Sequence, residues 1–457
     1  MSSGYVQSIP TDVLCDIFHL LCDAPIALHD LKNESHFHEF PWAVGQVCSH
    51  WRGVFLSYAP LWASFALKPG AFSAAQFAEM NRRATIYLER SGQHPLTIDV
   101  TMRRSYAENF PKSVWRMLLS CLKRWKKVNL VLAYGPARNE FFRCRGYMSS
   151  LESLRMSIPN SVALKNYNTF QLASQLIELD LAHPGYGATW QFPWTQLRKL
   201  KIETVCDEFK NYGDNLWGVL FQLENIEELH LIIIFSYDFP RLPSSLPIIH
   251  LPGLRLLEIS LAFAMMFSWF TAPLLEHLHI HGYNNASNVH NCFHNGQPYE
   301  RELMSLIRRS SFHIRRLALD NGRVPETRIL MKALASVEEL SVTYPMSTLG
   351  VIQDVTGVDG CIYLPKLQVL RVGLCFIRGA LVKKAVTAIS RLLEARGKGL
   401  SLPSHVVAPL EKFVLRLTFR GKFPDGVLEV MHGWPSIAQV YINGSVLERL
   451  SCDPNDS

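Results

Sequence analysis

The chain has 457 residues, of which 48% are hydrophobic and 19% are charged, and this composition excludes a disordered chain. The net charge of +7 is too weak and too dispersed to indicate nucleic acid or a membrane surface as partner. No apolar run approaches the ~20 residues of a membrane-spanning helix, and the start lacks the basic region of a signal peptide. We therefore expect a cytoplasmic and/or nuclear protein.

Two short amphipathic helices are expected near the N-terminus. Pro10 precedes a stripe of apolar residues at helical spacing, which runs from Val13 to Leu21. A second stripe runs from Val44 to Phe55, and the following Pro60-Leu61-Trp62 is expected to end it. Helices this short cannot bury all these apolar residues unaided, so some of them are expected to face a partner.

The pattern L-x-x-L-x-L, with other apolar residues allowed for Leu, recurs nine times from Leu151 to Val372. Most copies follow one another at intervals of about 20–29 residues, which is the repeat length of leucine-rich repeats. Weaker outer copies lie at Trp125–Leu130 and Leu410–Leu415. In each L-x-L, the two apolar side chains point to one face of a short strand, and the residue between them points to the other.

Such strands cannot bury their apolar faces alone, but stacked side by side they form a parallel ladder with a shared core. Glu300–Arg309 and Gly379–Arg396 have the apolar spacing of helices that connect such strands. The sequence thus predicts an α/β leucine-rich-repeat-like solenoid, a parallel strand ladder with convex helices and loops, preceded by an all-α domain. A doubly wound sheet is the alternative, although its strands are usually longer apolar runs.

The expected domains are a helical domain at 8–63, connecting helices with a first strand unit at 64–124, the irregular repeats at 125–450 and a tail at 451–457. The residues between the paired apolar positions should form a column on the concave face of the ladder. Because the column mixes both charge signs, a protein or peptide substrate is a better match than nucleic acid. An ordinary solvated sheet face is the alternative. The column comprises Arg155, Asp180, Lys201, His230, Glu258, His279, Ala318, Ser341 and Arg371.

Histidines are concentrated around one copy of the pattern. His277 and His281 share a face with His279, and His290, Cys292 and His294 follow closely. Alternate residues on a strand are ~6–7 Å apart, too far for adjacent metal ligands without a bend. We therefore expect a polar face with a histidine-rich loop, and no metal or cofactor. The sequence also lacks phosphate-loop, nucleophile-elbow and zinc-protease motifs, so no catalytic residue is assigned and no enzyme is expected.

The N-terminal segment resembles the F-box. The stretch Ile9-Pro-Thr-Asp-Val-Leu-Cys-Asp-Ile-Phe18 is similar to the family pattern L-P-x-E-[IL]-L-x-x-I-F. Val47-Cys-Ser-His-Trp-Arg52 and Ala59-Pro-Leu-Trp62 are similar to its V-C-[RK]-x-W-R and P-x-L-W. Together with Tyr87–Leu96, they make the chain resemble F-box-like proteins with irregular leucine-rich repeats, which are abundant in mushroom-forming fungi.

The resemblance implies a substrate-recognition adaptor of a cullin-RING ubiquitin ligase. Its F-box would bind the Skp-type linker subunit, and its repeats would bind the protein to be ubiquitinated. A ligase-independent scaffold whose F-box-like segment caps the repeats is the alternative. The residues that the family pattern would place at or behind the linker surface are Pro10, Leu14, Ile17, Val47, Trp51, Leu61 and Trp62.

Overall fold

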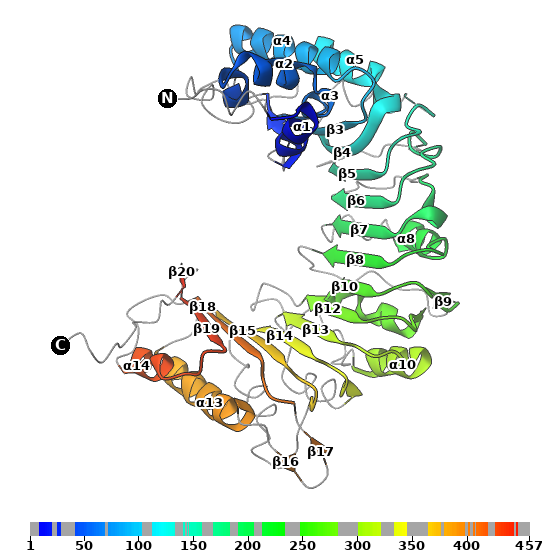
Figure 1. Ribbon diagram of the computed structural model, residues 1–457. Helices are drawn as coiled ribbons and strands as arrows, with labels where there is room; N and C mark the ends of the chain where they lie inside the picture. The colour runs from blue at the N-terminus through cyan, green and yellow to red at the C-terminus, as the bar shows by residue number, and fades with distance from the viewer. Residues whose placement is uncertain are drawn as a thin grey trace, which may run out of the picture. The chain divides into compact units, whose positions relative to one another are not determined.

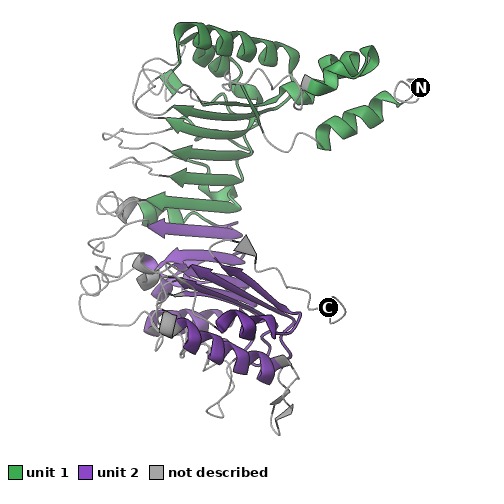
Figure 2. Ribbon diagram, turned by 90° about the vertical axis from the view of Figure 1, so that its left-hand side faces the viewer, with its two compact units in different colours: residues 1–223 green, residues 224–457 purple. Residues whose placement is uncertain are grey.

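The computed structural model forms two compact units, residues 1–223 and 224–457 (Figure 2). The boundary falls inside the segment 125–450 for which the sequence predicts repeats. The residues that the structure describes are 9–20, 25–28, 42–68, 72–102, 112–132, 140–141, 144, 146–157, 168–182, 191–204, 213–233, 247–281, 300–320, 333–344, 364–375, 379–397, 401–402, 405–406, 408–418, 426–442 and 445–446.

In the first unit, seven parallel strands, β1 to β7, follow one another in chain order across the sheet. The elements of this unit (Figure 1) are α1 (Thr11–Leu20), β1 (Ile26–Ala27), η3 (Trp42–Gln46), α2 (Ser49–Ser57), α3 (Ala59–Trp62), β2 (Ser64–Leu67), α4 (Ala74–Arg90), β3 (Leu96–Met102), α5 (Lys112–Ser120), η5 (Leu122–Arg124), β4 (Trp125–Leu132), β5 (Ser153–Ser157), β6 (Glu178–Ala182), η6 (Trp194–Gln196), β7 (Lys199–Thr204) and α8 (Gly213–Leu220).

In the second unit, the strand order is β8-β10-β12-β13-β14-β15-β18-β19, all parallel, with β20 added antiparallel at the end. Two short pairs, β9 with β11 and β16 with β17, lie outside this sheet. The elements are β8 (Glu228–Ile233), β9 (Ile249–His250), β10 (Leu256–Ser260), η7 (Leu261–Ser268), β11 (Phe270–Thr271), β12 (His277–His281), α10 (Glu300–Ser310), β13 (Arg316–Asp320), β14 (Glu339–Tyr344), β15 (Val369–Cys375), α13 (Gly379–Gly397), β16 (Ser401–Leu402), β17 (His405–Val406), β18 (Lys412–Thr418), α14 (Val427–His432), β19 (Ala438–Ile442) and β20 (Ser445–Val446).

The repeated L-x-L segments set the register of the strands in both units. All nine form strands, and both outer copies do so as well, in β4 and β18. In the first unit Leu179 pairs with Leu200, and in the second Leu257 pairs with Leu278, which pairs with Leu317. These leucines are buried, whereas the residues between them are at least partly exposed. The α/β fold and its parallel strands are therefore confirmed, and within each unit the core lies on one face of the strands.

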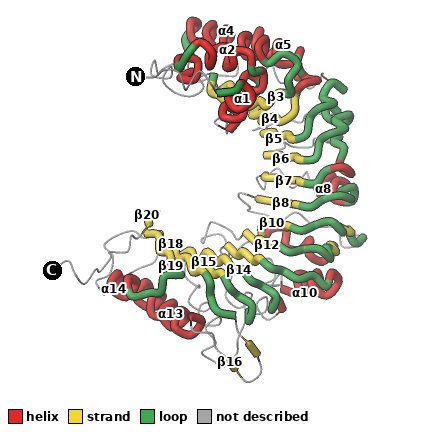
Figure 3. The backbone as a smooth tube through the Cα atoms, in the orientation of Figure 1, coloured by secondary structure: helices red, strands yellow, loops and turns green. Residues whose placement is uncertain are grey.

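The helices of the second unit lie on the core side of its strands. The predicted helices appear as α10 and α13, and both contribute buried apolar residues such as Leu303, Leu306 and Ile389. Figure 3 shows α10 and α13 on one side of the strands, and no described helix lies on the other side. The polar side chains of these strands therefore lie on a face that no described helix covers.

The N-terminal stripes form helices with one difference from expectation. The first gives α1, and the second gives the short helix η3 followed by α2. Pro60 was expected to end the helical segment, but it lies in the first turn of a further helix, α3. Proline is tolerated there because its missing N–H would have no partner within the helix. The break falls at Tyr58, whose backbone leaves the helical region. The segment after α1 also contains β1, which pairs with β2.

Among the described residues, none of the helices combines the length and the apolar character that crossing a membrane requires. The expected tail at 451–457 and the segment that contains His290, Cys292 and His294 lie outside the described residues.

Candidate functional site

The seven residues that the F-box resemblance assigns to linker binding differ widely in exposure. Trp62 is buried by ring contacts with Phe55 and Tyr87, and its indole N–H donates to the carbonyl of Phe55 at 3.1 Å. Trp51 packs edge-on against the buried ring of Phe18. The buried members are Leu14, Leu61 and Trp62, the half-buried ones are Ile17 and Trp51, and the exposed ones are Pro10 and Val47.

Several apolar side chains in and beside these helices are in contact with solvent. The exposed fractions are 43% for Val13 and 73% for Leu20, both in α1, and 50% for Val47 and 39% for Leu56, in and before α2. The sequence predicted that part of the stripes would remain unburied, and the structure shows which part. The buried members are the ones that hold the helices to the first unit.

The strand register brings the predicted column of the first unit together. Arg155 pairs with Asp180, which pairs with Lys201. The Arg155 guanidinium lies 3.4 Å from the Asp180 carboxylate, and the Lys201 ammonium lies 3.1 Å from Glu203 in its own strand. The Arg155 side chain is 59% exposed. These are exposed or half-exposed ion pairs of the kind that water screens strongly.

The column of the second unit is also in register. His230 pairs with Glu258, Glu258 with His279, and His279 with Ala318. The column continues through Ser341 to Arg371. All the predicted column residues therefore occupy the predicted positions on the strands.

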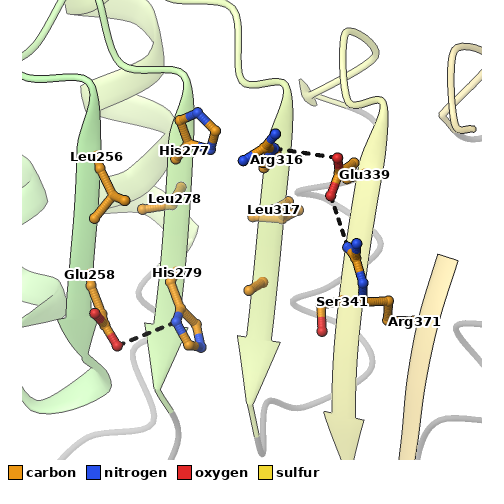
Figure 4. A pocket seen from close by; sticks show the side chains of 11 residues that line it. Leu256, Glu258, His277, Leu278, His279, Arg316, Leu317, Glu339, Ser341 and Arg371 are labelled. Carbon is orange, nitrogen blue, oxygen red and sulfur yellow. Dashed lines mark hydrogen bonds and ion pairs between the residues drawn. The ribbon is translucent and has the colours of Figure 1, made fainter. Parts of the chain in front are cut away.

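A shallow pocket of about 210 Å³ lies on this face. Figure 4 shows Glu258 and His279 at one end of it and Arg316, Glu339 and Arg371 at the other. The Glu339 carboxylate lies 2.8 Å from Arg371 and 3.3 Å from Arg316. Burial raises the pKa of Glu339, but the hydrogen bond from Arg371 and the charge of Arg316 outweigh it, so the net shift is downward.

At one end of the pocket, three histidines surround two carboxylates. We call His230, Glu258, His279, His281 and Asp320 the histidine–carboxylate cluster. One oxygen of Glu258 accepts from Nδ1 of His230, and the other accepts from Nε2 of His281 and lies 3.4 Å from Nδ1 of His279. One oxygen of Asp320 lies 2.8 Å from Nε2 of His279 and 3.1 Å from Nδ1 of His281. The rings of His279 and His281 are 3.8 Å apart between centroids.

These contacts shift the acid–base equilibria of the cluster. Hydrogen bonds from His230, His279 and His281 lower the pKa of Glu258 far below its ordinary value, against the opposing effect of burial. Burial raises the pKa of Asp320, but hydrogen bonds from His279 and His281 outweigh it and lower that pKa. Burial lowers the pKa of His279, but the hydrogen bonds to Asp320 and Glu258 reverse this and raise it to about 9. The same balance raises the pKa of His281.

Strand spacing alone keeps alternate residues too far apart to be adjacent metal ligands. Side chains of alternate residues can lean together, and the rings of His279 and His281 do so because both reach between Glu258 and Asp320. The sequence column also missed Arg316, Asp320 and Glu339. A signal for them was present, because residues just before and just after each L-x-L point to the same face as the residue between the leucines.

The comparisons with known proteins give no further information about this site. No protein-family model matches the sequence, and no curated protein matches it either.

Proposed function

We propose that this chain is the substrate receptor of a cullin-RING ubiquitin ligase. In this proposal, the parallel ladder is a leucine-rich-repeat-like solenoid whose polar face binds a protein, and the N-terminal helices are an F-box that binds the Skp-type linker. The proposal places the protein in the cytoplasm and/or the nucleus, where such ligases act. The linker and one protein substrate are its partners, and the chain itself carries no catalysis.

The observation that carries the proposal is the exposure of large apolar side chains on the N-terminal helices. Val13 and Leu20 in the 10-residue α1 and Leu56 in the 9-residue α2 are each at least 39% exposed, and Val47, just before α2, is 50% exposed. A concentration of such residues on short helices is typical of a surface that a partner covers. Because the residues lie within the segment that resembles the F-box, a linker subunit is the partner that best explains them.

The part of the proposal that concerns substrate binding rests on the polar faces of the strands. Polar residues of both signs stand in register across the strands of each unit, on the side opposite the buried leucines. In the second unit, Arg316, Glu339 and Arg371 form ion pairs within a pocket. Mixed and partly paired charges of this kind select a partner by complementarity, which supports a polar protein segment as the ligand.

The buried residues of the same helices favour a second function, that of a cap on the end of the strand ladder. Leu14, Leu61 and Trp62 are at most 2% exposed, and Trp62 packs on Tyr87 of α4. These contacts are those of a cap that shields the end of a strand ladder. A cap needs the buried residues but not the exposed ones, so substitution of the exposed residues separates the two functions.

The test is calorimetric titration of the full-length chain with a purified Skp-type linker. Leu20→Asp combined with Val47→Asp places charges on two exposed sites, where they cause little loss of stability. We expect this double variant to weaken linker binding at least about tenfold, because charges in the apolar centre of an interface are strongly unfavourable.

The matched control is Leu274→Asp. Leu274 is 49% exposed, against 50% for Val47, but it lies in the second unit. We expect its affinity for the linker to equal that of the unsubstituted chain, and all three proteins to have the same circular dichroism spectrum. Failure of the unsubstituted chain to bind the linker would contradict the ligase proposal and leave the cap as the better account. Equal loss in both variants would contradict the assigned surface.

A further inference from the structure

We propose that Glu258, His279 and His281 bind a divalent first-row transition metal ion, and that Asp320 positions the two imidazoles. Three donor atoms, one from each ligand residue, lie within 4.8 Å of one another on strands β10 and β12. Neither the ligase proposal nor the resemblance to F-box proteins contains such a site.

One donor–donor distance of the group matches the requirement of a small metal ion, and all three donor atoms lie within 4.8 Å of one another. Metal–ligand distances of about 2.0–2.2 Å in a tetrahedron place neighbouring donors roughly 3.3–3.6 Å apart. The Glu258 oxygen and Nδ1 of His279 are 3.4 Å apart. The same Glu258 oxygen also faces Nε2 of His281. Binding of an ion at this point therefore requires the carboxylate of Glu258 and the ring of His281 to move apart.

The two rings present their nitrogens as a metal site requires, one toward Glu258 and the other toward Asp320. Both nitrogens of His279 and both nitrogens of His281 face a carboxylate oxygen. A neutral imidazole has a single N–H, so the metal-free arrangement is satisfied only when both rings are doubly protonated. A metal on the Glu258 side removes one proton from each ring and leaves the other N–H to donate to Asp320.

The outer residues of the cluster have the arrangement that metal sites use to hold their ligands. Asp320 accepts from Nε2 of His279 and Nδ1 of His281, which are the nitrogens that face away from Glu258. A carboxylate behind a metal-bound imidazole fixes its tautomer and orientation. His230 contacts the other oxygen of Glu258 through Nδ1, which leaves one carboxylate oxygen for the metal.

The donor set indicates the class of ion. Two imidazole nitrogens and one carboxylate oxygen suit zinc and its first-row neighbours, whereas magnesium and calcium prefer oxygen ligands alone. Three protein ligands leave one tetrahedral position for water or for a donor atom of a bound molecule. Glu258 and His279 also line the pocket beside Arg316, so a protein bound on this face would approach the ion.

The test is titration of the chelator-treated, untagged full-length chain with Zn²⁺, followed by calorimetry and by metal analysis after gel filtration. We expect one ion per chain and no binding of Mg²⁺. His279→Ala and His281→Ala are each expected to lower the affinity at least about 100-fold, since each removes a ligand. Asp320→Asn is expected to lower it about 10–100-fold through loss of the positioning contact.

Two controls identify the site. His277→Ala removes a half-buried histidine from the same strand and face but outside the cluster, and it should leave the affinity unchanged. The double variant His290→Ala/His294→Ala should also bind normally. Circular dichroism checks the fold of every variant, and the visible spectrum of bound Co²⁺ reports the coordination independently of fold. Absence of stoichiometric Zn²⁺ binding, or full affinity in a folded His279→Ala variant, would overturn the proposal.

Discussion

The two units use the same strand geometry but carry different chemistry on their polar faces. In the first unit, Arg155 and Asp180 form a pair in which the arginine side chain is 59% exposed. In the second, the corresponding column leads into the histidine–carboxylate cluster, where the His230 side chain is only 12% exposed. The backbone register is equally regular in both units. The parallel ladder therefore provides the positions, and the residues that flank each L-x-L determine whether those positions form a site.

The largest difference between the two units is expected in the local stability that each loses when one carboxylate is removed from its column. In metal-free protein, Glu258→Ala leaves His230, His279 and His281 without their common acceptor, so we expect a loss of about 2–4 kcal/mol in local stability. Asp180→Ala should cost about 0–1 kcal/mol, because water screens the Arg155 charge. Hydrogen exchange of β12 and β6 in the two variants measures both effects. Equal losses would show that the two columns do not differ.

A smaller effect is expected from pH, again in metal-free protein. The pKa of His279 rises from 6.5 to about 9 in the folded chain, and that of His281 also rises. A raised histidine pKa stabilises the fold fully below about pH 6.5, and this stabilisation is lost as pH approaches 9. The lowered pKa values of Glu258 and Asp320 stabilise the fold above their ordinary values of 4.5 and 3.8, and this contribution is lost on further acidification.

The second unit should therefore be most stable between about pH 4.5 and 6.5 and lose about 1–3 kcal/mol by pH 9. The first-unit pair of Arg155 and Asp180 should show no such loss. Exchange rates in β12 and β6, corrected for the intrinsic effect of pH, test this difference. Stability of β12 that is constant from pH 6 to 9 would show that the histidines are not paired as described.

The strands could be predicted because their signal is local. Each L-x-L specifies by itself which side chains are buried, and Leu179 and Leu278 follow that rule. The cluster could not be predicted in the same way. His279 and Asp320 are 41 residues apart, and they meet only because β12 pairs with β13. Which strand lies next to which depends on the whole ladder.

The N-terminal helices show a second limit of sequence patterns. Helical periodicity predicted α1 from its apolar spacing, but Leu14 is buried whereas the adjacent Val13 is 43% exposed. Both residues fit the same apolar stripe, and only the packing of α1 against α2 and α3 distinguishes them. Pro60 shows the same dependence on context, since proline ends a helix in its interior but is compatible with its first turn.

The most direct test of the ligase account is hydrogen exchange of the full-length chain with and without a purified Skp-type linker. The account predicts slower exchange in α1 and α2 when the linker is bound, because a partner then covers the exposed apolar residues around Leu20 and Val47. Exchange in β6 and β12 should not change. A linker complex in which α1 and α2 exchange as fast as in the free chain would contradict the account.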